Sequence, residues 1–303
     1  MKIGPNDLVL DVGSGHNPNP RSDVLCDRYI DDDTERGGSI RVDRPLIVGD
    51  GHNLPFKDKA FDYVIASHII EHMDDPARFC SELMRVSRRG FIASPTELAE
   101  HMFYWSFHKW YVNKMGDKLI LHPKVNVPNI FGELFDYLYE YNPWYARFHR
   151  SLPDMFWMEY EWDGAIQIEI RDRSPLDLEN PRALKRMVIP RESLPTSLKR
   201  SAVTLADHFL PPAAHRLITR ARRVKRTPAR KISLESILAC PACGGDVKTL
   251  RDAVKCQRCG RVYPIERGFP MMLVDQGMRN RPPDAATLPA MSASAEQPQA
   301  GAS

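Results

Sequence analysis

Residues 8–15 constrain the fold more than any other stretch of this 303-residue chain. They read Leu-Val-Leu-Asp-Val-Gly-Ser-Gly, an apolar run that contains Asp11 and breaks into Gly13 and Gly15. A continuous apolar run without polar alternation is typical of a strand buried in a parallel sheet. Glycine lets a backbone approach a ligand closely, and ligands of open α/β sheets lie beyond the carboxyl ends of the strands. The stretch therefore predicts a bound ligand over the two glycines.

Further apolar runs of the same kind follow. They are Val24–Asp27, Leu46–Asp50, Phe61–Ala66 and Gly90–Pro95. A helix is expected from Pro76 to Val86, because Asp75 precedes the proline and the apolar residues 79, 83 and 86 have helical spacing. Strands that alternate with helices predict an α/β fold.

Short motifs between residues 8 and 95 make the prediction more specific. They are Gly49-Asp50, Leu54-Pro55-Phe56, Phe61-Asp62, Glu71-His72 and Arg85-Val86. In order and spacing these motifs resemble the class I S-adenosylmethionine-dependent methyltransferases, in particular the type 11 subgroup. The resemblance implies a Rossmann-like, seven-stranded sheet that closes with an antiparallel hairpin. It also implies S-adenosylmethionine as the cofactor.

The resemblance carries roles for individual residues. Asp27 ends the second strand, where a carboxylate can accept both ribose hydroxyls of a nucleoside. Asp50 would accept the adenine amino group, and the residues after it would pack along the base. The expected cofactor-binding residues are Asp11, Gly13 and Gly15 at the methionine end, then Asp27, Asp50, Gly51, His52 and Leu54.

The loop after Gly15 departs from the family pattern. Asn17 stands where a third glycine is usual, and Pro18 and Pro20 follow. The short, proline-containing segment before Asp27 leaves no room for the usual helix. The departure keeps a different class of function open, namely a non-catalytic scaffold with a degenerate methyltransferase fold.

Two histidines follow the fourth predicted strand. His68 lies at the expected position of the methyl group and is the candidate general base, because histidine titrates near neutrality. A polar residue that only orders the loop is the other interpretation. His72 is one helical turn further on, beside Glu71, and this spacing also hints at a metal site. The Glu-His pair is nevertheless common in the resembling family without a metal.

Residues 96–154 are predicted to form an insertion after the fifth strand. Eighteen of the 27 aromatic residues fall between residues 103 and 162, including all five tryptophans. Such a segment suits the wall of a binding pocket or a stacking platform, or else a small aromatic core. We expect it to be a substrate lid. The expected lid residues are His101, Trp105, His108 and Trp110.

Residues 155–170 alternate apolar and polar positions around Asp163-Gly164, which predicts a β-hairpin. The methyltransferase domain is therefore expected to comprise residues 1–172. Residues 173–231 are rich in proline and increasingly basic, with eight Lys or Arg and no acid in 216–231. This segment is a linker, an amphipathic membrane-surface segment or an RNA-contacting arm.

Residues 232–275 form a different predicted module. Its two Cys-x-x-Cys pairs are separated by twelve residues, and four thiolates suit tetrahedral zinc. The predicted ligands of this structural Zn²⁺ are Cys240, Cys243, Cys256 and Cys259. The module resembles the small zinc-ribbon subunits that activate tRNA, rRNA and release-factor methyltransferases, here fused in cis. Residues 276–303 have few apolar anchors and are expected to be a disordered tail.

The sequence thus predicts a methyltransferase that acts on an oxygen of a small molecule, glycan or lipid-linked sugar. The position that carries Asn/Asp-Pro-Pro-Tyr/Phe in amino-methylating relatives reads Ala66-Ser67-His68-Ile69, which disfavours exocyclic amines and glutamine. The alternative is an RNA or protein methyltransferase with its activator in cis. No run approaches the ~18 apolar residues of a membrane span, and no signal peptide is visible. We therefore expect a cytoplasmic protein, with residues 216–231 as a candidate contact to RNA or to the inner membrane surface.

Overall fold

The structure, a computed structural model, describes residues 1–275 except 104, 126–130, 178–179, 183–184, 186–197, 199–200 and 202–231, and also residues 277–279. Its centre is a six-stranded sheet in the order β3-β2-β1-β4-β5-β8. The strands are β1 (Val9–Val12), β2 (Val24–Asp27), β3 (Leu46–Val48), β4 (Tyr63–Ser67), β5 (Arg89–Pro95) and β8 (Trp157–Asp163). The first five are parallel, and β8 runs antiparallel to β5.

The apolar runs of the sequence form the central strands as expected. Strands β1, β2 and β3 are buried along their whole length. No helix or strand lies between β1 and β2 or between β2 and β3, so the loops of residues 13–23 and 28–45 alone make the crossovers between these parallel strands. The mixed α/β fold is therefore confirmed, with six strands in the main sheet where seven were expected.

Helix α1 (Pro76–Val86) packs against the sheet and begins as the sequence predicts. The Asp75 side chain accepts a hydrogen bond from the backbone nitrogen of Arg78, and Pro76 occupies the first turn. The Arg85 guanidinium donates to the carbonyls of Leu54 and Phe56 at 2.8 and 2.6 Å. The Arg-Val motif thus holds the loop after β3.

The expected closing hairpin is only half correct. Strand β8 joins the main sheet, but β9 (Gln167–Ile170) leaves it and pairs in parallel with β7 (Lys118–Pro123). Together with β6 (Trp110–Met115) these two strands form a separate three-stranded sheet. The insertion offers β9 a free strand edge, which residues 155–170 alone cannot reveal.

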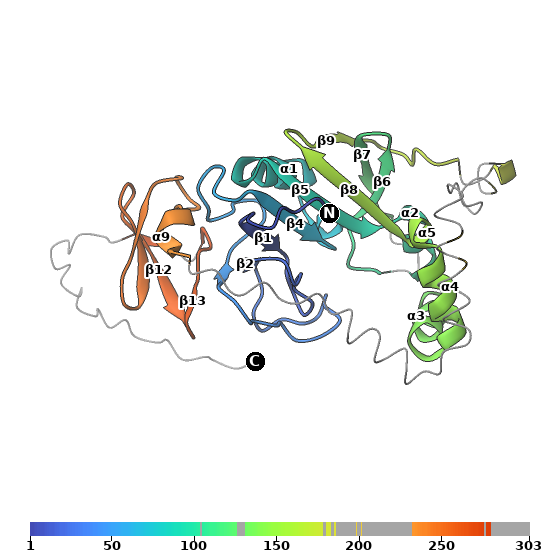
Figure 1. Ribbon diagram of the computed structural model, residues 1–303, viewed down its shortest axis with the longest axis horizontal. Helices are drawn as coiled ribbons and strands as arrows, with labels where there is room; N and C mark the ends of the chain where they lie inside the picture. Colours follow the sequence, from blue (N-terminus) through green and yellow to red (C-terminus); the bar gives the residue numbers. More distant parts are fainter. Residues whose placement is uncertain are drawn as a thin grey trace, which may run out of the picture.

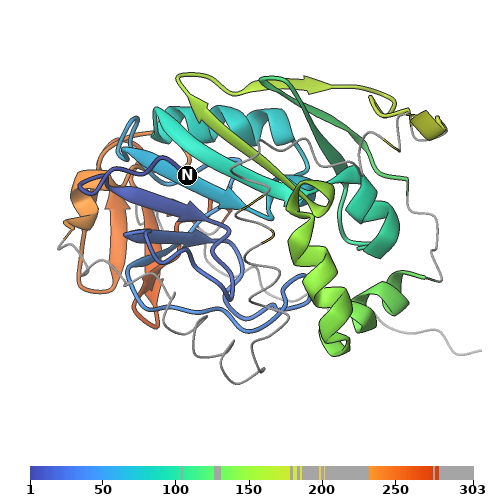
Figure 2. The same cartoon turned by 45° about the vertical axis from the view of Figure 1, so that its right-hand side comes forward.

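The insertion after β5 contains both strands and helices. Besides β6 and β7 it comprises α2 (Glu97–Phe103), α3 (Gly132–Tyr141), α4 (Pro143–Ser151) and α5 (Pro153–Phe156). In Figure 1 helices α3 and α4 lie at the opposite end of the molecule from the C-terminal module. Figure 2 shows them below the end of β8 that follows α5.

The C-terminal module is a small antiparallel sheet that begins with α9 (Leu234–Ile237). Its strands are β10 (Val247–Thr249), β11 (Ala253–Cys256), β12 (Arg261–Glu266), β13 (Phe269–Pro270) and β14 (Met278–Arg279). Strand β14 pairs with β12 beyond residue 275, where a disordered tail was expected. We call residues 232–279 the ribbon.

The ribbon docks on β3, the edge strand of the main sheet. The backbone nitrogen of Met272 donates to the carbonyl of Val48 at 2.8 Å, and Val48 and Met271 form a parallel bridge. On the neighbouring loop, Leu238 bridges Phe56, and both residues are fully buried. One hydrophobic cluster runs from the main sheet into the ribbon, so the two units share a core.

The basic segment of residues 216–231 lies outside the described residues, as does nearly all of the expected tail. Among the helices that the structure describes, none is long and apolar enough to cross a membrane.

Candidate functional site

A pocket of about 240 Å³ lies where the strands β1 to β4 end. This is the place at which open α/β sheets bind ligands. Its walls come from these strand ends, from the loops after β2 and β4, and from Lys109 of the insertion. The lining residues are Val12, Gly13, Gly15, Cys26, Asp27, Arg28, Tyr29, Asp32, Glu35, Arg36, Gly49, Asp50, Gly51, His52, His68, Ile69, His72, Met73, Asp74 and Lys109.

The glycine turn after β1 forms one wall. Gly13 has a φ of 69° and Gly15 a φ of 49°, both in the left-handed region that glycine adopts without strain. A Cβ atom on Gly13 would lie 2.5 Å from Cδ1 of Ile69. The sequence needs glycine here for two reasons, since both the backbone angle and the close approach of Ile69 exclude a side chain.

Asp27 lies at the end of β2 and is buried in the wall of the pocket. Its Oδ2 accepts a hydrogen bond from the Gly15 backbone nitrogen at 2.9 Å, and its Oδ1 accepts one from the Tyr29 nitrogen at 3.1 Å. Nη1 of Arg36 is 4.0 Å from Oδ1. Nε of Arg36 is buried without a hydrogen-bond partner among the described residues. Sequence reasoning missed Arg36, which lies in a loop without a motif.

Asp50 follows β3 and also lines the pocket. Its Oδ2 contacts Nη1 of Arg28 at 2.6 Å, and its Oδ1 accepts a hydrogen bond from the backbone nitrogen of His52 at 2.9 Å. Gly51 and His52 line the pocket beside it. Leu54 does not line the pocket. It is buried, and its nitrogen donates to Glu82 of α1 at 2.7 Å.

Asp11 is buried within β1 and does not line the pocket. Its Oδ2 accepts hydrogen bonds from the Asn19 nitrogen at 2.7 Å and from Oγ of Ser22 at 3.4 Å. Burial raises the pKa of Asp11 to about 7, although the bond from Asn19 and the charge of Arg44 act in the opposite direction. Through the bonds from Asn19 and Ser22, Asp11 holds the loop after Gly15 in place.

This raised pKa predicts how stability depends on pH. The folded state holds the Asp11 proton more tightly than the unfolded state, so the contribution of this group is fully present below pH ~4 and is lost as pH rises towards ~7. We expect Asp11→Asn to remove a dependence of up to about 1.4 kcal/mol per pH unit in this window. Urea unfolding between pH 5 and 8 measures it.

Asp62→Asn is the matched control, because Asp62 is exposed and also accepts a backbone N–H, that of Leu8. If Asp11→Asn and Asp62→Asn change the free energy of unfolding with the same pH dependence, Asp11 is not the group that titrates.

His68 is at the end of β4 and projects into the pocket wall with half of its side chain exposed. Its φ is 56°, which is uncommon for a residue with a side chain, and its nitrogen donates to the carbonyl of Ala93 at 2.8 Å. The ring lies edge-on to Trp157 at 4.9 Å between centroids. Nδ1 is 3.6 Å from Oε1 of Glu71, an electrostatic contact rather than a full hydrogen bond.

Glu71, one half of the Glu-His motif, is fully buried in the 3-10 helix η1 (Ile70–His72). Burial alone would raise its pKa, but the contact with His68 and the charges of His68, His108 and His72 outweigh burial and lower the pKa to about 2. The carboxylate is therefore ionised at neutral pH. Sequence reasoning connected Glu71 with His72 but did not foresee His108, which comes from the insertion.

The four expected lid residues do not line the pocket. Trp105 stacks on Phe103 at 5.1 Å, and Nε1 of Trp110 donates to the Met73 carbonyl at 2.7 Å. His101 is half-exposed on α2, and His108 is buried. Among the described residues of the insertion, Lys109 lines the pocket, and its Nζ contacts Asp74 at 2.5 Å.

Two buried glutamates of α2 explain how the insertion is held together. Glu97 accepts hydrogen bonds from Asn113 at 2.6 Å and from Ser174 at 2.8 Å. Glu100 contacts Nδ1 of His108 and accepts from Nζ of Lys124 at 2.5 Å. These buried hydrogen bonds and ion pairs fix α2 against β6 and β7, which makes this part of the insertion a packed unit.

In the ribbon, the four predicted cysteines come together. Their sulfur atoms all lie within 4.8 Å of one another, with 3.7 Å between Cys240 and Cys259 and 3.6 Å between Cys243 and Cys256. The hydroxyl of Tyr263 is 3.1 Å from the Cys240 sulfur. Four sulfurs in one small space fit a tetrahedral, closed zinc site. We call them the four-cysteine cluster.

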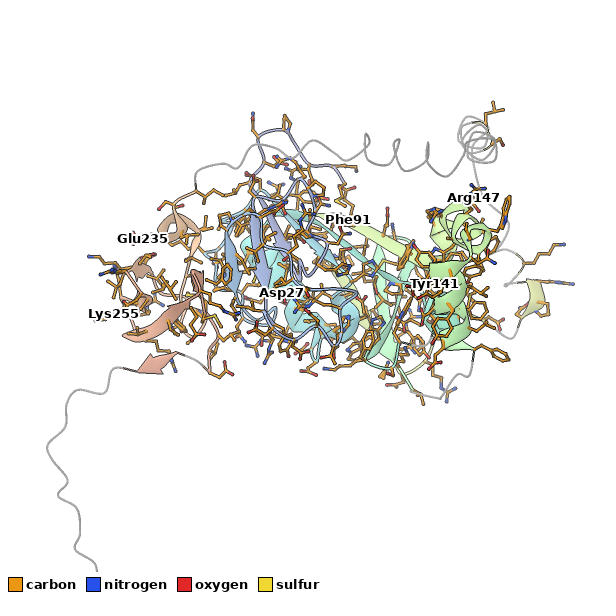
Figure 3. All side chains as sticks on the ribbon, turned by 90° about the horizontal axis from the view of Figure 1, so that it is seen from below. Asp27, Phe91, Tyr141, Arg147, Glu235 and Lys255 are labelled. Atoms are coloured by element: carbon orange, nitrogen blue, oxygen red, sulfur yellow. The ribbon has the colours of Figure 1, made fainter. Side chains whose placement is uncertain are left out.

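Figure 3 shows where the pocket residue Asp27 lies relative to the ribbon. The labelled Asp27 lies in the middle of the molecule, with Lys255 of the ribbon towards one end and Tyr141 of the insertion towards the other. Arg267 of the ribbon reaches the loop after β2 and contacts Asp31 through two guanidinium nitrogens, at 3.0 and 2.5 Å. The ribbon therefore contacts the same loop that supplies pocket residues.

Comparisons with known proteins find two families that match separate segments of the chain. Residues 26–93 match the family described as Methyltransferase domain, and residues 231–268 match the family described as Trm112p-like protein. The demethylmenaquinone methyltransferase of Paenarthrobacter aurescens is 32% identical over 95 residues, which is 30% of this chain and 37% of the relative. The ajmaline N-methyltransferase of Rauvolfia serpentina is 44% identical over 43 residues, 14% of this chain and 15% of the relative.

A solved complex between the Trm112 methyltransferase activator of Haloferax volcanii and a protein assigned as a methyltransferase is also similar. It has a TM-score of 0.29 and 18% identity, and covers 43% of this chain and 71% of that chain. The chain spans 37% of the length of the quinone methyltransferase that it matches. The family matches confirm the resemblance drawn from the sequence motifs at both ends: the chain combines a domain of the type 11 methyltransferase family with a C-terminal domain of the Trm112p-like family.

Proposed function

We propose that this protein transfers a methyl group from S-adenosylmethionine to an oxygen atom of a small-molecule, glycan or lipid-linked acceptor. The observation that carries the proposal is the pocket at the ends of β1 to β4, into which the glycine turn, Asp27 and Asp50 converge. When bound, the cofactor supplies a methyl group on a positively charged sulfur, which a nucleophile can attack directly.

The residues of the pocket fit this cofactor. A carboxylate at the end of β2 suits the two ribose hydroxyls, and a second carboxylate after β3 suits an amino group on the base. Nε of Arg36, buried without a partner in the described part of the chain, can donate to the carboxylate of the methionine end. We assign these roles to Asp27, Asp50 and Arg36, with the backbone of Gly13 and Gly15 beside the methionine end.

Titration calorimetry with S-adenosylhomocysteine tests the cofactor. We expect micromolar binding to the zinc-loaded protein. A folded, zinc-loaded protein that binds neither this compound nor S-adenosylmethionine would favour the scaffold function instead.

His68 is our candidate for the group that accepts the acceptor's proton. Its ring reaches the pocket from the end of β4, and ionised Glu71 behind it stabilises the protonated imidazole that this step forms. We assign His68 no role in binding the cofactor. Deprotonation of the acceptor and alignment of its oxygen are the contributions that the protein has to make.

Replacement of His68 tests that role. We expect His68→Gln to lower kcat by about 100-fold, the usual contribution of a positioned base, while affinity for S-adenosylhomocysteine stays unchanged. Release of S-adenosylhomocysteine with hydroxylated acceptors from a screen measures turnover. His16→Gln is the control, because His16 is exposed and outside the pocket lining. Equal turnover of His68→Gln and wild type would rule out a base at this position.

The relatives support a small acceptor. Two that match this chain are named for demethylmenaquinone and ajmaline, both small molecules. One of these names gives nitrogen as the acceptor atom and the other gives no atom. Our choice of oxygen therefore rests on the residues after β4, which lack the motif of enzymes that methylate exocyclic amines and glutamine.

The Trm112p-like match favours a second candidate, methylation of RNA or protein with the activator in cis. RNA binding whose affinity falls steeply with salt would support it, because phosphate contacts release counterions. Binding of short RNA hairpins, compared at low and at several-fold higher salt, distinguishes the two candidates.

A further inference from the structure

We propose that Glu71, His72 and His108 bind one divalent transition-metal ion, at a site separate from the four-cysteine cluster. Glu71 and His72 belong to η1 on the pocket wall, whereas His108 belongs to the insertion, just before β6. The ion would therefore connect the insertion to the wall of the cofactor pocket.

The three side chains offer ligand atoms that already lie together. One ligand atom of each lies within 4.8 Å of the other two, and the rings of His72 and His108 are 4.6 Å apart at nearly a right angle. Ligand atoms around one zinc-sized ion are about 3.4 Å apart, because each bond is about 2.1 Å long. Small side-chain movements are enough to close the site.

The carboxylate of Glu71 lacks the partners that a buried charge needs. Glu71 is fully buried, and neither of its oxygen atoms has a hydrogen-bond partner among the described residues. A buried carboxylate without hydrogen bonds or a cation is strongly unfavourable, so buried charges are normally paired or bind metals. His68 approaches Oε1 only to 3.6 Å, and a carboxylate has lone pairs enough for His68 and an ion together.

Both histidines are held in the way that metal-binding histidines are. Nδ1 of His72 lies 3.1 Å from Oε2 of Glu35, and Nδ1 of His108 contacts Oε1 of Glu100. An imidazole that donates its Nδ1–H to a carboxylate keeps the lone pair of Nε2 for a metal ion, and such outer carboxylates are a regular part of metal sites. Glu100 is itself fixed by Lys124 at 2.5 Å.

The set of ligands indicates the class of ion. Two imidazoles and one carboxylate suit Zn²⁺, Fe²⁺, Co²⁺ or Mn²⁺, whereas Mg²⁺ and Ca²⁺ prefer oxygen ligands alone. Three protein ligands leave coordination positions for water or another oxygen donor.

Counting metal ions tests the site without cofactor or methyl transfer. The full chain is freed of metal, reconstituted with excess Co²⁺, desalted and measured by mass spectrometry of the metal. We expect two ions for the wild type and one for His108→Gln. A wild type with one ion overturns the proposal, whatever the variants do.

The control is His101→Gln, a histidine of the same insertion that is half-exposed and outside the site, which should keep two ions. Visible spectra add a second readout, since Co²⁺ in a site of nitrogen and oxygen ligands lacks the strong thiolate bands of the four-cysteine cluster. Loss of a thiolate-type ion in His108→Gln, or retention of both ions, would contradict the assignment. A thermal melt of each variant shows that the protein remains folded.

Discussion

Cys256→Ser is expected to unfold the ribbon and also to weaken cofactor binding, although Cys256 does not line the pocket, because the ribbon and the main sheet share one core. Structural zinc contributes on the order of 10 kcal/mol to the folding of small zinc modules. Serine cannot replace a thiolate ligand, so most of this contribution is lost. Thermal unfolding followed by circular dichroism, together with calorimetry with S-adenosylhomocysteine, measures both effects.

The coupling follows from the backbone contacts at β3. Without the ribbon, the carbonyl of Val48 loses its bond from Met272, and that of Pro55 loses its bond from Ala239. Phe56 is fully buried beside Leu238 and would become exposed. Since Asp50 lies between these contacts, we expect the loop that carries it to lose its fixed position.

Lys255→Ala is the matched control, an exposed position on the same strand β11. It should leave both measurements unchanged. If Cys256→Ser melted and bound S-adenosylhomocysteine like the wild type, the ribbon would be an independent domain and the coupling would be wrong. The substitution is a more specific test than removal of zinc with a chelator, because a chelator would also remove an ion bound at Glu71, His72 and His108.

Asp27→Asn is expected to lower the affinity for S-adenosylhomocysteine roughly 10- to 100-fold, because hydrogen bonds to a charged group contribute about 1.5–3 kcal/mol each. The asparagine side chain keeps the size and one accepting oxygen, so the turn at Gly15 can still be held. What it loses is the negative charge and the second acceptor oxygen, which also accepts the N–H of Tyr29. Calorimetric titration measures the change, and a thermal melt reports on the fold.

Asp33→Asn provides the comparison for that experiment. Asp33 contacts Arg36 at 2.9 Å, as Asp27 does at a longer distance, but it does not line the pocket. Its substitution should leave affinity within about two-fold, well inside the scatter expected for surface changes. Equal losses in both variants would mean that Arg36, and not the Asp27 carboxylate, determines binding.

The main strands and the glycine turn could be predicted because their signals are local. The run from Leu8 to Val12 is apolar apart from Asp11 since β1 is buried between β2 and β4, and Gly13 is required by its own backbone angle. The four cysteines could be predicted for the same reason, because paired spacing alone directs their sulfurs to one point.

What could not be predicted from the sequence depends on contacts between distant segments. The two strands around Gly164 do not pair with each other. Strand β9 pairs instead with β7 of the insertion, a partner that the sequence of residues 155–170 does not specify. His108 was expected in a substrate lid, yet it is buried, its Nδ1 contacts Glu100, and it does not line the pocket. Asp11 was expected at the cofactor, but its side chain bonds to the loop at Asn19. A sequence motif can single out residues such as Asp11, but it does not show whether their side chains face the pocket or the interior of the protein.

The docking of the ribbon on β3 has a consequence for how this chain behaves on dilution. An open strand edge invites pairing with other chains, and natural proteins normally protect it. Here the protecting segment is part of the same polypeptide, so its local concentration does not depend on how much protein is present. A two-chain assembly of the same surfaces would separate at low abundance, whereas this edge stays covered even in a single isolated molecule.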